Sequence, residues 1–255
     1  MMRAAVLAIA MLQTGCASDA GEPPDVASGS CETTTFEGAW LTHCMADPAR
    51  HRIRTALGGK DGPPYRNLRT LIEAEPEAPI AFAMNAGMYD ASGMPIGLYI
   101  EDGEERVALN GNDGPGNFHL LPNGIFFGSD GVWKVLQTDT YRGQTGVEFA
   151  TQSGPMLVID GELHPDISED GVSRYVRNGV GVDAQGRAHF VITNQAVSFG
   201  KLARYFRDEL STANALYLDG SVSALYDPVN ERLDTGVPIG PMLVVERRSE
   251  GDGRS

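Results

Sequence analysis

The stretch Asn214-Ala-Leu-Tyr-Leu-Asp219-Gly-Ser-Val-Ser-Ala-Leu-Tyr226 joins an apolar run to a polar turn. Residues 215–218 predict a buried strand, which fixes the position of whatever stands at its end. Gly220 permits a positive φ and a close approach of a ligand to the main chain. A carboxylate, a hydroxyl and free backbone N–H groups at such a turn suit a sugar or a phosphate. Because Asp-Gly is also a common turn pair, the stretch alone fits an ordinary strand-to-turn connection as well.

A second apolar run also ends in a polar, glycine-bearing turn. Residues 78–84 predict a strand, and Asn85-Ala-Gly-Met-Tyr-Asp90 follows it. Polar residues recur at such places, beside a glycine or at the edge of an apolar run: Asn85, Asn123, Gln152, Ser153, Arg177, Asn178, Asn194 and Asp219. Each alone fits a turn or a cap. Together, these amide, hydroxyl, guanidinium and carboxylate groups are typical of a carbohydrate or phosphosugar site.

Most of the remaining chain alternates short apolar runs with glycine-bearing turns, which predicts β-hairpins. Only residues 65–74 and 198–210 carry apolar side chains at helical spacing, the second with Ser198 as an N-cap. Residues 36–57 have no clear pattern and predict an edge strand followed by an exposed loop, with His43 and His51 on the surface. The elements predict an α+β fold: a single domain, residues 32–246, of mixed, mostly antiparallel sheets with a few flanking helices.

The composition and motif content exclude several classes of protein. The 255 residues carry a formal net charge of -14, which argues against nucleic-acid binding because phosphate backbones need a basic face. The sequence has no Gly-x-Ser-x-Gly elbow, no P-loop and no dinucleotide fingerprint. Its five histidines do not pair at metal-ligand spacing, so neither a metal nor another cofactor is expected.

The N-terminus has the form of an export signal. Residues 1–15 combine Arg3 with an apolar run that is too short for a stable membrane anchor, as in a signal peptide. Cys16 then stands where a bacterial lipoprotein carries its lipid, although Gln13 departs from that pattern and leaves ordinary signal cleavage open. Residues 16–31 predict a flexible tether, and residues 247–255 a disordered tail. The protein is therefore expected in the bacterial cell envelope, touching a membrane only through Cys16.

Two cysteines lie just inside the predicted domain. Cys31 and Cys44 are expected to form a disulfide, because an exported protein meets oxidising conditions. Cys16 is then the unpaired cysteine, which fits its separate role.

Five motifs in order along the chain resemble the phosphodiester glycosidase family, in its bacterial exported branch. They are Asn85-Ala-Gly-Met-Tyr-Asp90, Pro122-Asn-Gly-Ile-Phe126, Thr151-Gln-Ser-Gly-Pro-Met156, Arg177-Asn-Gly-Val-Gly181 and Leu216-Tyr-Leu-Asp-Gly-Ser221. The resemblance covers roughly residues 78–246. Ala86 stands where the family has a glycine, Asn178 where it has a threonine, and Ser221 and Val222 where it has two glycines, so the backbone near the sugar is less free here.

The resemblance implies hydrolysis of a sugar–phosphate linkage. Asp219 is expected to activate water or stabilise the sugar cation, and Arg177 to bind phosphate oxygens. Asn85 and Ser153 are expected to bind sugar hydroxyls. The other residues expected at the substrate are Gly87, Asn123, Gln152, Gly154, Asn178, Asn194, Gly220 and Ser221.

Two other functions fit the same residues. One is a non-catalytic envelope lipoprotein that binds glycans, phosphosugars or phospholipid head groups through the same pocket. The other is a glycosidase or transferase that acts on exopolysaccharide. In each case the partner is a carbohydrate or a sugar phosphate and not a nucleic acid.

Overall fold

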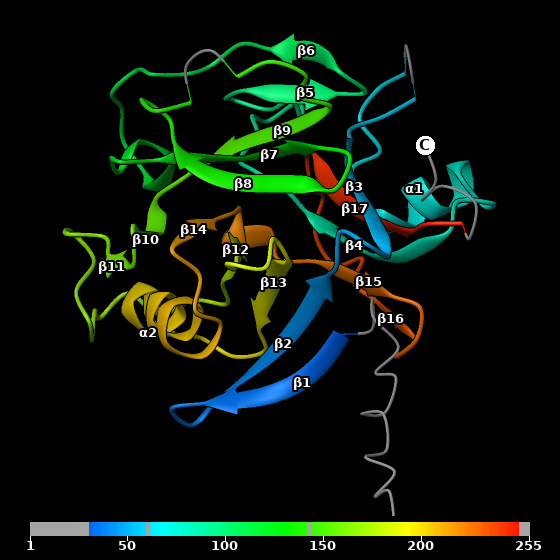
Figure 1. Ribbon diagram of the computed structural model, residues 1–255. Helices are drawn as coiled ribbons and strands as arrows, with labels where there is room; N and C mark the ends of the chain where they lie inside the picture. The colour runs from blue at the N-terminus through cyan, green and yellow to red at the C-terminus, as the bar shows by residue number, and fades with distance from the viewer. Residues whose placement is uncertain (1–30, 60–61, 142–143, 250–255) are drawn as a thin grey trace, which may run out of the picture.

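Three antiparallel sheets and a few short helices make up the protein (Figure 1). The computed structural model describes residues 31–59, 62–141 and 144–249. The predicted signal peptide, the lipidation site Cys16 and the tether up to residue 30 lie outside these residues, as does most of the predicted tail. No helix within the described ranges is long and apolar enough to span a membrane.

The first sheet has seven strands, the other two have five each, and every pairing among the described strands is antiparallel. The first sheet runs in the order β1 (Cys31–Phe36), β2 (Ala39–Ala46), β13 (Ala188–Thr193), β12 (Asn178–Val182), β14 (Asn214–Tyr217), β10 (Met156–Ile159) and β11 (Glu162–Leu163). The second is β16 (Arg232–Leu233), β15 (Leu225–Asp227), β4 (Ile80–Asn85), β17 (Met242–Arg247) and β3 (His51–Ala56). The third is β6 (Glu104–Val107), β5 (Tyr99–Glu101), β9 (Phe149–Ser153), β7 (Gly124–Ser129) and β8 (Val132–Gln137).

One apolar core joins the three sheets. The ring of Phe190 in the first sheet lies 5.2 Å from that of Phe82 in the second and 5.8 Å from that of Phe126 in the third, each edge to face. Such aromatic pairs add about 1 kcal/mol each beyond the area they bury. The sheets therefore form a single domain around shared side chains.

Two helices cover outer faces of the sheets. Helix α1 (Leu68–Ala74) packs Leu68 and Leu71 against the second sheet, and the Asn67 side chain caps it by accepting from the Thr70 N–H. Helix α2 (Phe199–Arg204) continues as a π-helix, Tyr205–Glu209, and lies on the first sheet. Ser198 caps it, as predicted. Two 3-10 turns complete the described helices: η1 (Asn117–His119) and η3 (Gly220–Val222). The α+β class with mostly antiparallel sheets is confirmed.

The interpretation of residues 36–57 was wrong. They contain two strands, and β2 lies inside the first sheet between β1 and β13. His51 is buried and accepts from the backbone N–H of Asp47, and only 12% of the His43 side chain is exposed. The pattern was missed because β2 buries residues on both faces, so apolar and polar side chains do not alternate along it.

Strands β9, β15 and β16 were not predicted from the sequence either. Strand β9 lies in the middle of the third sheet, buried on both faces, so it shows no apolar–polar alternation. At the other end of the chain, β17 includes Arg247, where the disordered tail was expected to begin.

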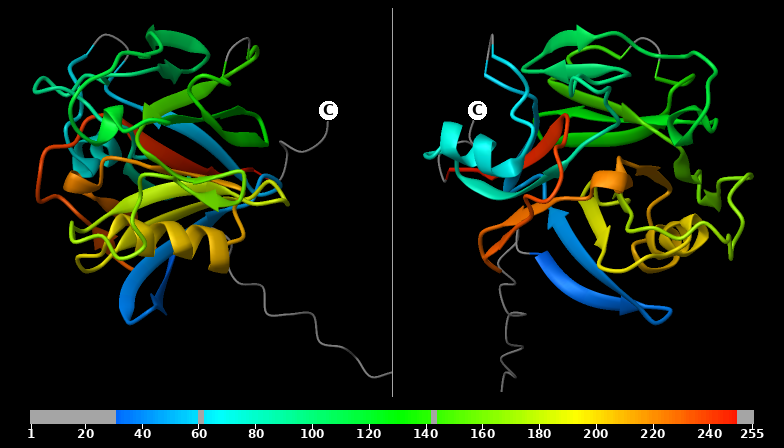
Figure 2. Two further views of the ribbon diagram at one scale, coloured as in Figure 1. Left: turned by 90° about the vertical axis from the view of Figure 1, so that its left-hand side faces the viewer. Right: turned by 180° about the vertical axis from the view of Figure 1, so that it is seen from behind.

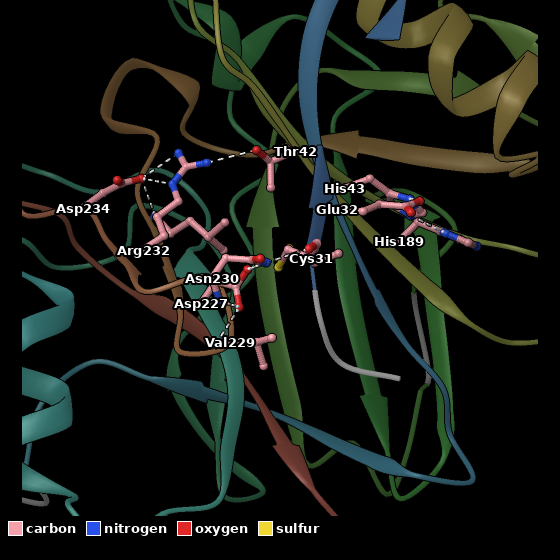
Figure 3. The surroundings of a disulfide bond; sticks show 12 residues. Cys31, Glu32, Thr42, His43, His189, Asp227, Val229, Asn230, Arg232 and Asp234 are labelled. Carbon is pink, nitrogen blue, oxygen red and sulfur yellow. Dashed lines mark hydrogen bonds and ion pairs between the residues drawn. A yellow bond between two sulfur atoms is a disulfide. The ribbon is translucent and has the colours of Figure 1, made fainter. Parts of the chain in front are cut away.

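Cys31 and Cys44 are joined by a disulfide. They are directly opposite each other in the β1–β2 hairpin, with Cα atoms 4.1 Å apart (Figure 3). The bond closes a loop with a sequence separation of 13. We expect the double variant Cys31→Ala, Cys44→Ala to unfold with a free energy about 3 kcal/mol lower, in the chain-entropy account. Urea denaturation measures this loss, and reduced wild type should match the variant. An unchanged unfolding midpoint would contradict the prediction.

A row of titratable side chains crosses the first sheet beside the disulfide (Figure 3). His43 Nε2 lies 2.9 Å from His189 Nδ1, and His189 Nε2 lies 3.0 Å from Asp183 Oδ2. Arg187 Nε also contacts Asp183, at 2.6 Å, and Glu32 lies 3.5 Å from His43 Nδ1. These hydrogen bonds are all formed when both imidazole rings are neutral: His189 Nε2 donates to Asp183, and His43 Nε2 donates to His189 Nδ1.

Acid is therefore expected to destabilise the fold through His43. Burial, and secondly the neighbouring His189, lower the pKa of His43 from 6.5 to about 4. As the pH falls, His43 is therefore protonated in the unfolded chain before it is protonated in the folded protein. The free energy of unfolding has its full value above pH 6.5 and falls by on the order of 2–3 kcal/mol as the pH drops to about 4. Urea denaturation between pH 7 and 4 measures this slope. His43→Gln should flatten it, and an equal slope in that variant would refute the assignment.

Candidate functional site

Asn85, the last residue of β4, joins three strand ends through its side chain. Its Nδ2 donates to the backbone carbonyl of Asp219 at 2.8 Å. Its Oδ1 accepts from Asn178 Nδ2 at 2.7 Å and from the backbone N–H of Ala224 at 3.0 Å. The Asp219 N–H in turn donates to the carbonyl of Ala86. Three residues predicted from the sequence, Asn85, Asn178 and Asp219, are thus brought into one hydrogen-bonded group.

The strand order explains this meeting point. In the first sheet β14 pairs with β12, and the Leu218 N–H donates to the Asn178 carbonyl just beyond the ladder. The chain then turns at residues 219–224 and enters the second sheet as β15, which pairs with β4. Figure 2 shows this link in orange, passing between the two sheets in the view from behind. The turn at Asp219 therefore stands where the two sheets meet.

The Asp219 carboxylate is half-buried and accepts from the Ser221 N–H at 3.3 Å. Burial raises the pKa of Asp219 above its ordinary value, against the hydrogen bonds from Ser221. Its charge acts on two tyrosines: burial and then the Asp219 charge raise the pKa of Tyr89, and burial raises that of Tyr217, to which the same charge adds. The site thus holds a partly buried carboxylate whose charge reaches two phenols.

Arg177 is enclosed by the protein. Its side chain is 1% exposed, and its guanidinium carbon lies 3.5 Å from the centre of the Phe199 ring. Its Nε donates to the Val197 carbonyl and its Nη2 to the Ser173 carbonyl. Burial lowers the pKa of Arg177, and Tyr217 opposes that shift. The guanidinium is an internal cation in an aromatic cage.

Tyr217 is the residue on which the charges of Arg177 and Asp219 both act. Consecutive residues of a strand point to opposite faces, so Asn178 reaches Asn85 while Arg177 points to the face covered by α2. The Tyr217 ring lies on that second face, packed against Phe199 at 4.7 Å between ring centres. Both the Arg177 cation and the Asp219 anion act on its hydroxyl.

Gly220 makes room for that tyrosine. A Cβ atom on Gly220 would lie 2.4 Å from the Tyr217 hydroxyl, closer than atoms approach without a shift. Ser221, the next residue, is exposed and contributes its N–H to Asp219. Glycine at 220 is therefore required by the phenol that links Arg177 to the turn.

Gln152 and Asn123 hold loops. Gln152 Oε1 accepts from the backbone N–H groups of Leu98 and Asn110 at 2.8 and 3.0 Å, and its Nε2 donates to the Asn110 carbonyl. Asn123 Nδ2 donates to the Phe118 carbonyl at 2.9 Å. Asn123 also lines a pocket of about 510 Å³ that does not include Asp219, Arg177 or Asn85. The contacts of both amides are therefore within the protein.

The end of β9 approaches the Asn85 turn closely. The Gly87 N–H donates to Thr151 Oγ1, and a Cβ on Gly87 would lie 2.2 Å from the Gln152 carbonyl oxygen. Gly154 packs in the same way against Asn123. The hydroxyl of Ser153 and the Oδ1 of Asn178 are buried and have no hydrogen-bond partner among the described residues. Unpaired buried polar atoms are rare, and two of the five among the described residues belong to Ser153 and Asn178, so this region is a functional candidate.

Asn194 lies apart from this group. It is exposed and bonds to Thr42 and Arg232, on the far side of β13 from Asn178. Tyr217 and Tyr89 were not predicted as site residues, although each stands inside one of the motifs that resemble the family. Tyr217 was detectable, because it precedes Asp219 by two residues and so shares its side of an extended chain. No group of three or more His, Cys, Asp or Glu side chains in the part of the chain that the structure describes is arranged to hold a metal ion.

This chain matches one family model over most of its length and is similar to one curated bacterial protein. A family model described as phosphodiester glycosidase matches residues 78–246. The uncharacterized protein YigE of Escherichia coli (strain K12) is 34% identical over 203 residues, covering 79% of this chain and 80% of that protein.

Two solved structures share the fold. The catalytic domain of zebrafish N-acetylglucosamine-1-phosphodiester alpha-N-acetylglucosaminidase, auto-inhibited by its pro-peptide, has a TM-score of 0.59 at 16% identity, over 86% of this chain and 82% of that one. A hypothetical protein from Synechocystis has a TM-score of 0.55 at 14% identity, over 86% of this chain and 61% of that one.

Proposed function

Since this chain belongs to the phosphodiester glycosidase family, we propose that it is an exported hydrolase that cleaves a sugar from a sugar-phosphate diester. The observation that carries the proposal is the hydrogen-bonded group of Asn85, Asn178 and Asp219. Three of the motifs that resemble the family supply these residues, and the fold brings them together from strands far apart in the sequence. Among the described carboxylates, Asp219 combines partial burial with a place in that group.

The reaction suits a site of this kind. Water adds to the anomeric carbon, the bond from that carbon to the phosphate oxygen breaks, and the phosphate monoester leaves with the electron pair. Because a phosphate monoester is already a good leaving group, the enzyme chiefly has to stabilise the cationic sugar and the negative phosphate. An ionised Asp219 would stabilise the sugar cation or take a proton from the attacking water.

The other residues have supporting roles in this proposal. Asn85 holds the backbone of Asp219, so it acts as a positioning residue rather than a ligand for sugar hydroxyls. Arg177 supplies positive charge from behind Tyr217. Ser153 and Asn178, whose buried polar atoms have no hydrogen-bond partner among the described residues, are the candidates for sugar hydroxyls. The N–H groups of residues 220–223 all donate within the turn, so they are not free for the phosphate.

A hydrolysis assay tests the proposal. The zebrafish relative is named for N-acetylglucosamine-1-phosphodiesters, so an alpha-N-acetylglucosamine-1-phosphodiester is the first substrate, followed by other sugar-1-phosphodiesters. The expected products are the free sugar and the phosphate monoester in equal amounts. No release from any of these substrates by the folded, oxidised protein would refute the hydrolase.

The alternative is a non-catalytic envelope protein that binds glycans or phosphosugars. The enclosure of Arg177 leaves this alternative open, because a guanidinium with no open face cannot supply the phosphate contact that was expected for the hydrolase. Binding of sugar-1-phosphodiesters without any turnover would support this alternative over the hydrolase.

We also propose that residues 1–15 direct export and that Cys16 carries a lipid, with residues 17–30 as a tether. The apolar run that ends at Gly15 and the polar stretch after Cys16 support this arrangement. The mass of the protein recovered from membranes tests it, and an unmodified Cys16 would contradict the anchor.

A further inference from the structure

Trp40 stands exposed among polar groups on the first sheet. Its residue is 56% exposed, whereas the second tryptophan of the chain, Trp133, is 4% exposed and belongs to the core. The Asn194 N–H donates to the Trp40 carbonyl at 2.9 Å, and the Trp40 N–H donates to Gln195 Oε1 at 3.3 Å. Asn194 and Gln195 are both exposed. Two residues with side-chain amides therefore bond to the backbone of Trp40.

An arginine from the second sheet completes this surface. Arg232 Nη1 donates to Thr42 Oγ1 at 3.0 Å and approaches Asn194 Oδ1 at 3.4 Å. Asp234 accepts from Arg232 Nε and Nη2 at 3.0 and 2.7 Å, which orients and neutralises the guanidinium (Figure 3). Asn194 Nδ2 donates to the same threonine hydroxyl. The Arg232 guanidinium and the Asn194 amide are thus held in place by hydrogen bonds that involve both the first and the second sheet.

This surface shares a face of the first sheet with Asn178, and Asp219 follows the end of β14 in the same sheet. Leu218, Asn178, Ile192 and Thr42 occupy one row across β14, β12, β13 and β2. Asn178 points from that row to Asn85. Trp40 lies two residues from Thr42 on β2, so its side chain is on the same face. Three strand spacings separate β2 from β14, which places Trp40 about 14 Å from the end of the strand that carries Asp219.

We propose that Trp40, Asn194, Gln195 and Arg232 form a subsite for a neutral sugar ring of a longer glycan whose phosphate-linked residue lies at Asp219. A tryptophan face packs against the C–H groups of a pyranose, while amides and a guanidinium bind its hydroxyls. Asp234 balances Arg232, so the subsite has no excess positive charge for an anionic ring. In naming a long glycan as the substrate, the inference rests on the proposed function.

Tryptophan and arginine are also common at protein interfaces. The immediate neighbours of Trp40 favour a sugar, because they are amides, hydroxyls and a guanidinium rather than apolar side chains. Thr35 is opposite Trp40 on β1, and Thr42 follows on the same face of β2. A hot spot for a protein partner needs a larger apolar patch around its aromatic anchor.

The test measures binding of three neutral hexasaccharides: chitohexaose, maltohexaose and cellohexaose. In a Trp133→Phe background Trp40 is the only tryptophan, so its fluorescence reports contact with the sugar directly. We expect a saturable change with at least one hexasaccharide. Calorimetry on wild-type protein should give the same affinity, so the result does not depend on that core substitution. Trp40→Ala should weaken binding at least tenfold, and Asn194→Ala severalfold.

The matched control is Val132→Ala. Val132 on β8 is equally exposed, at 56%, and lies in the third sheet, so its removal should change neither binding nor hydrolysis. Wild type that binds none of the three hexasaccharides overturns the subsite, as does binding that Trp40→Ala leaves intact. Trp40-dependent self-association without sugar binding also overturns it, in favour of a protein partner.

Binding and hydrolysis can fail independently in this design. Asp219→Asn should lose hydrolysis of a monosaccharide-1-phosphodiester and keep the affinity for the hexasaccharide. If wild type hydrolyses no phosphodiester but binds the hexasaccharide through Trp40, the proposed function fails and the sugar-binding surface stands. If it hydrolyses the phosphodiester but binds no hexasaccharide, the proposed function stands and the subsite fails.

Discussion

Replacing Asp219 with asparagine is expected to lower kcat for a sugar-1-phosphodiester by on the order of 10²–10⁴-fold, the range for losing a general base or a charge at the reacting centre. The change is nearly isosteric, and the Asn85 contact is to the backbone carbonyl, so the turn should stay in place. Steady-state kinetics on folded protein measures the loss. KM should change little, because the missing charge acts mainly in the transition state.

The pH profile gives a second readout for the same residue. Burial raises the pKa of Asp219, and the proposed roles need the ionised carboxylate. Activity should therefore fall as the pH drops through a value above the ordinary aspartate range, and this acid limb should be missing from the residual activity of Asp219→Asn.

Asp160→Asn is the matched control. Asp160 also heads an Asp-Gly turn after an apolar strand, but it is exposed and remote from the Asn85 group. Its substitution should leave kcat unchanged. Full activity in Asp219→Asn would show that another group carries the chemical step.

Replacing Arg177 is expected to have the second large effect, on stability as well as on catalysis. Arg177→Ala should lower the free energy of unfolding by about 3–5 kcal/mol, because it leaves a void under Phe199 and frees the carbonyls of Val197 and Ser173. Urea denaturation measures this loss. Arg52→Ala is the control: the Arg52 side chain is 49% exposed and lies 3.8 Å from Glu148, and its removal should cost at most about 1 kcal/mol.

Arg177→Met separates the charge from the packing. Methionine fills part of the volume without a positive charge, so the fold should suffer less than in Arg177→Ala. If the cation acts on the phosphate through Tyr217, kcat/KM for a phosphodiester should fall about 10²-fold, and that for a nitrophenyl glycoside without phosphate should fall less. Equal losses on both substrates would mean that Arg177 only supports the structure.

Much of this protein follows from local sequence. Asp102-Gly103, Ser129-Asp130-Gly131 and Asp183-Ala-Gln-Gly186 mark hairpins that the structure contains, because a tight turn and its flanking strands depend on residues close in the chain. Ser198 caps its helix for the same reason. The ordered motifs also predicted the family, which the family match confirms.

The tertiary structure alone decided how the sheets meet and what each site residue contacts. Asn85 and Asp219 are separated by 134 positions, and His43 and His189 by 146, so no local pattern could pair them. The sequence named Arg177 as an open phosphate ligand, but packing of α2 enclosed it beneath Phe199. Strand β2 escaped notice because both of its faces are covered in the fold, one by the shared core and the other by the cluster under α2. The burial of each side chain and its hydrogen-bond partners depend on packing between segments far apart in the chain. Local residue types and their spacing do not reveal that packing.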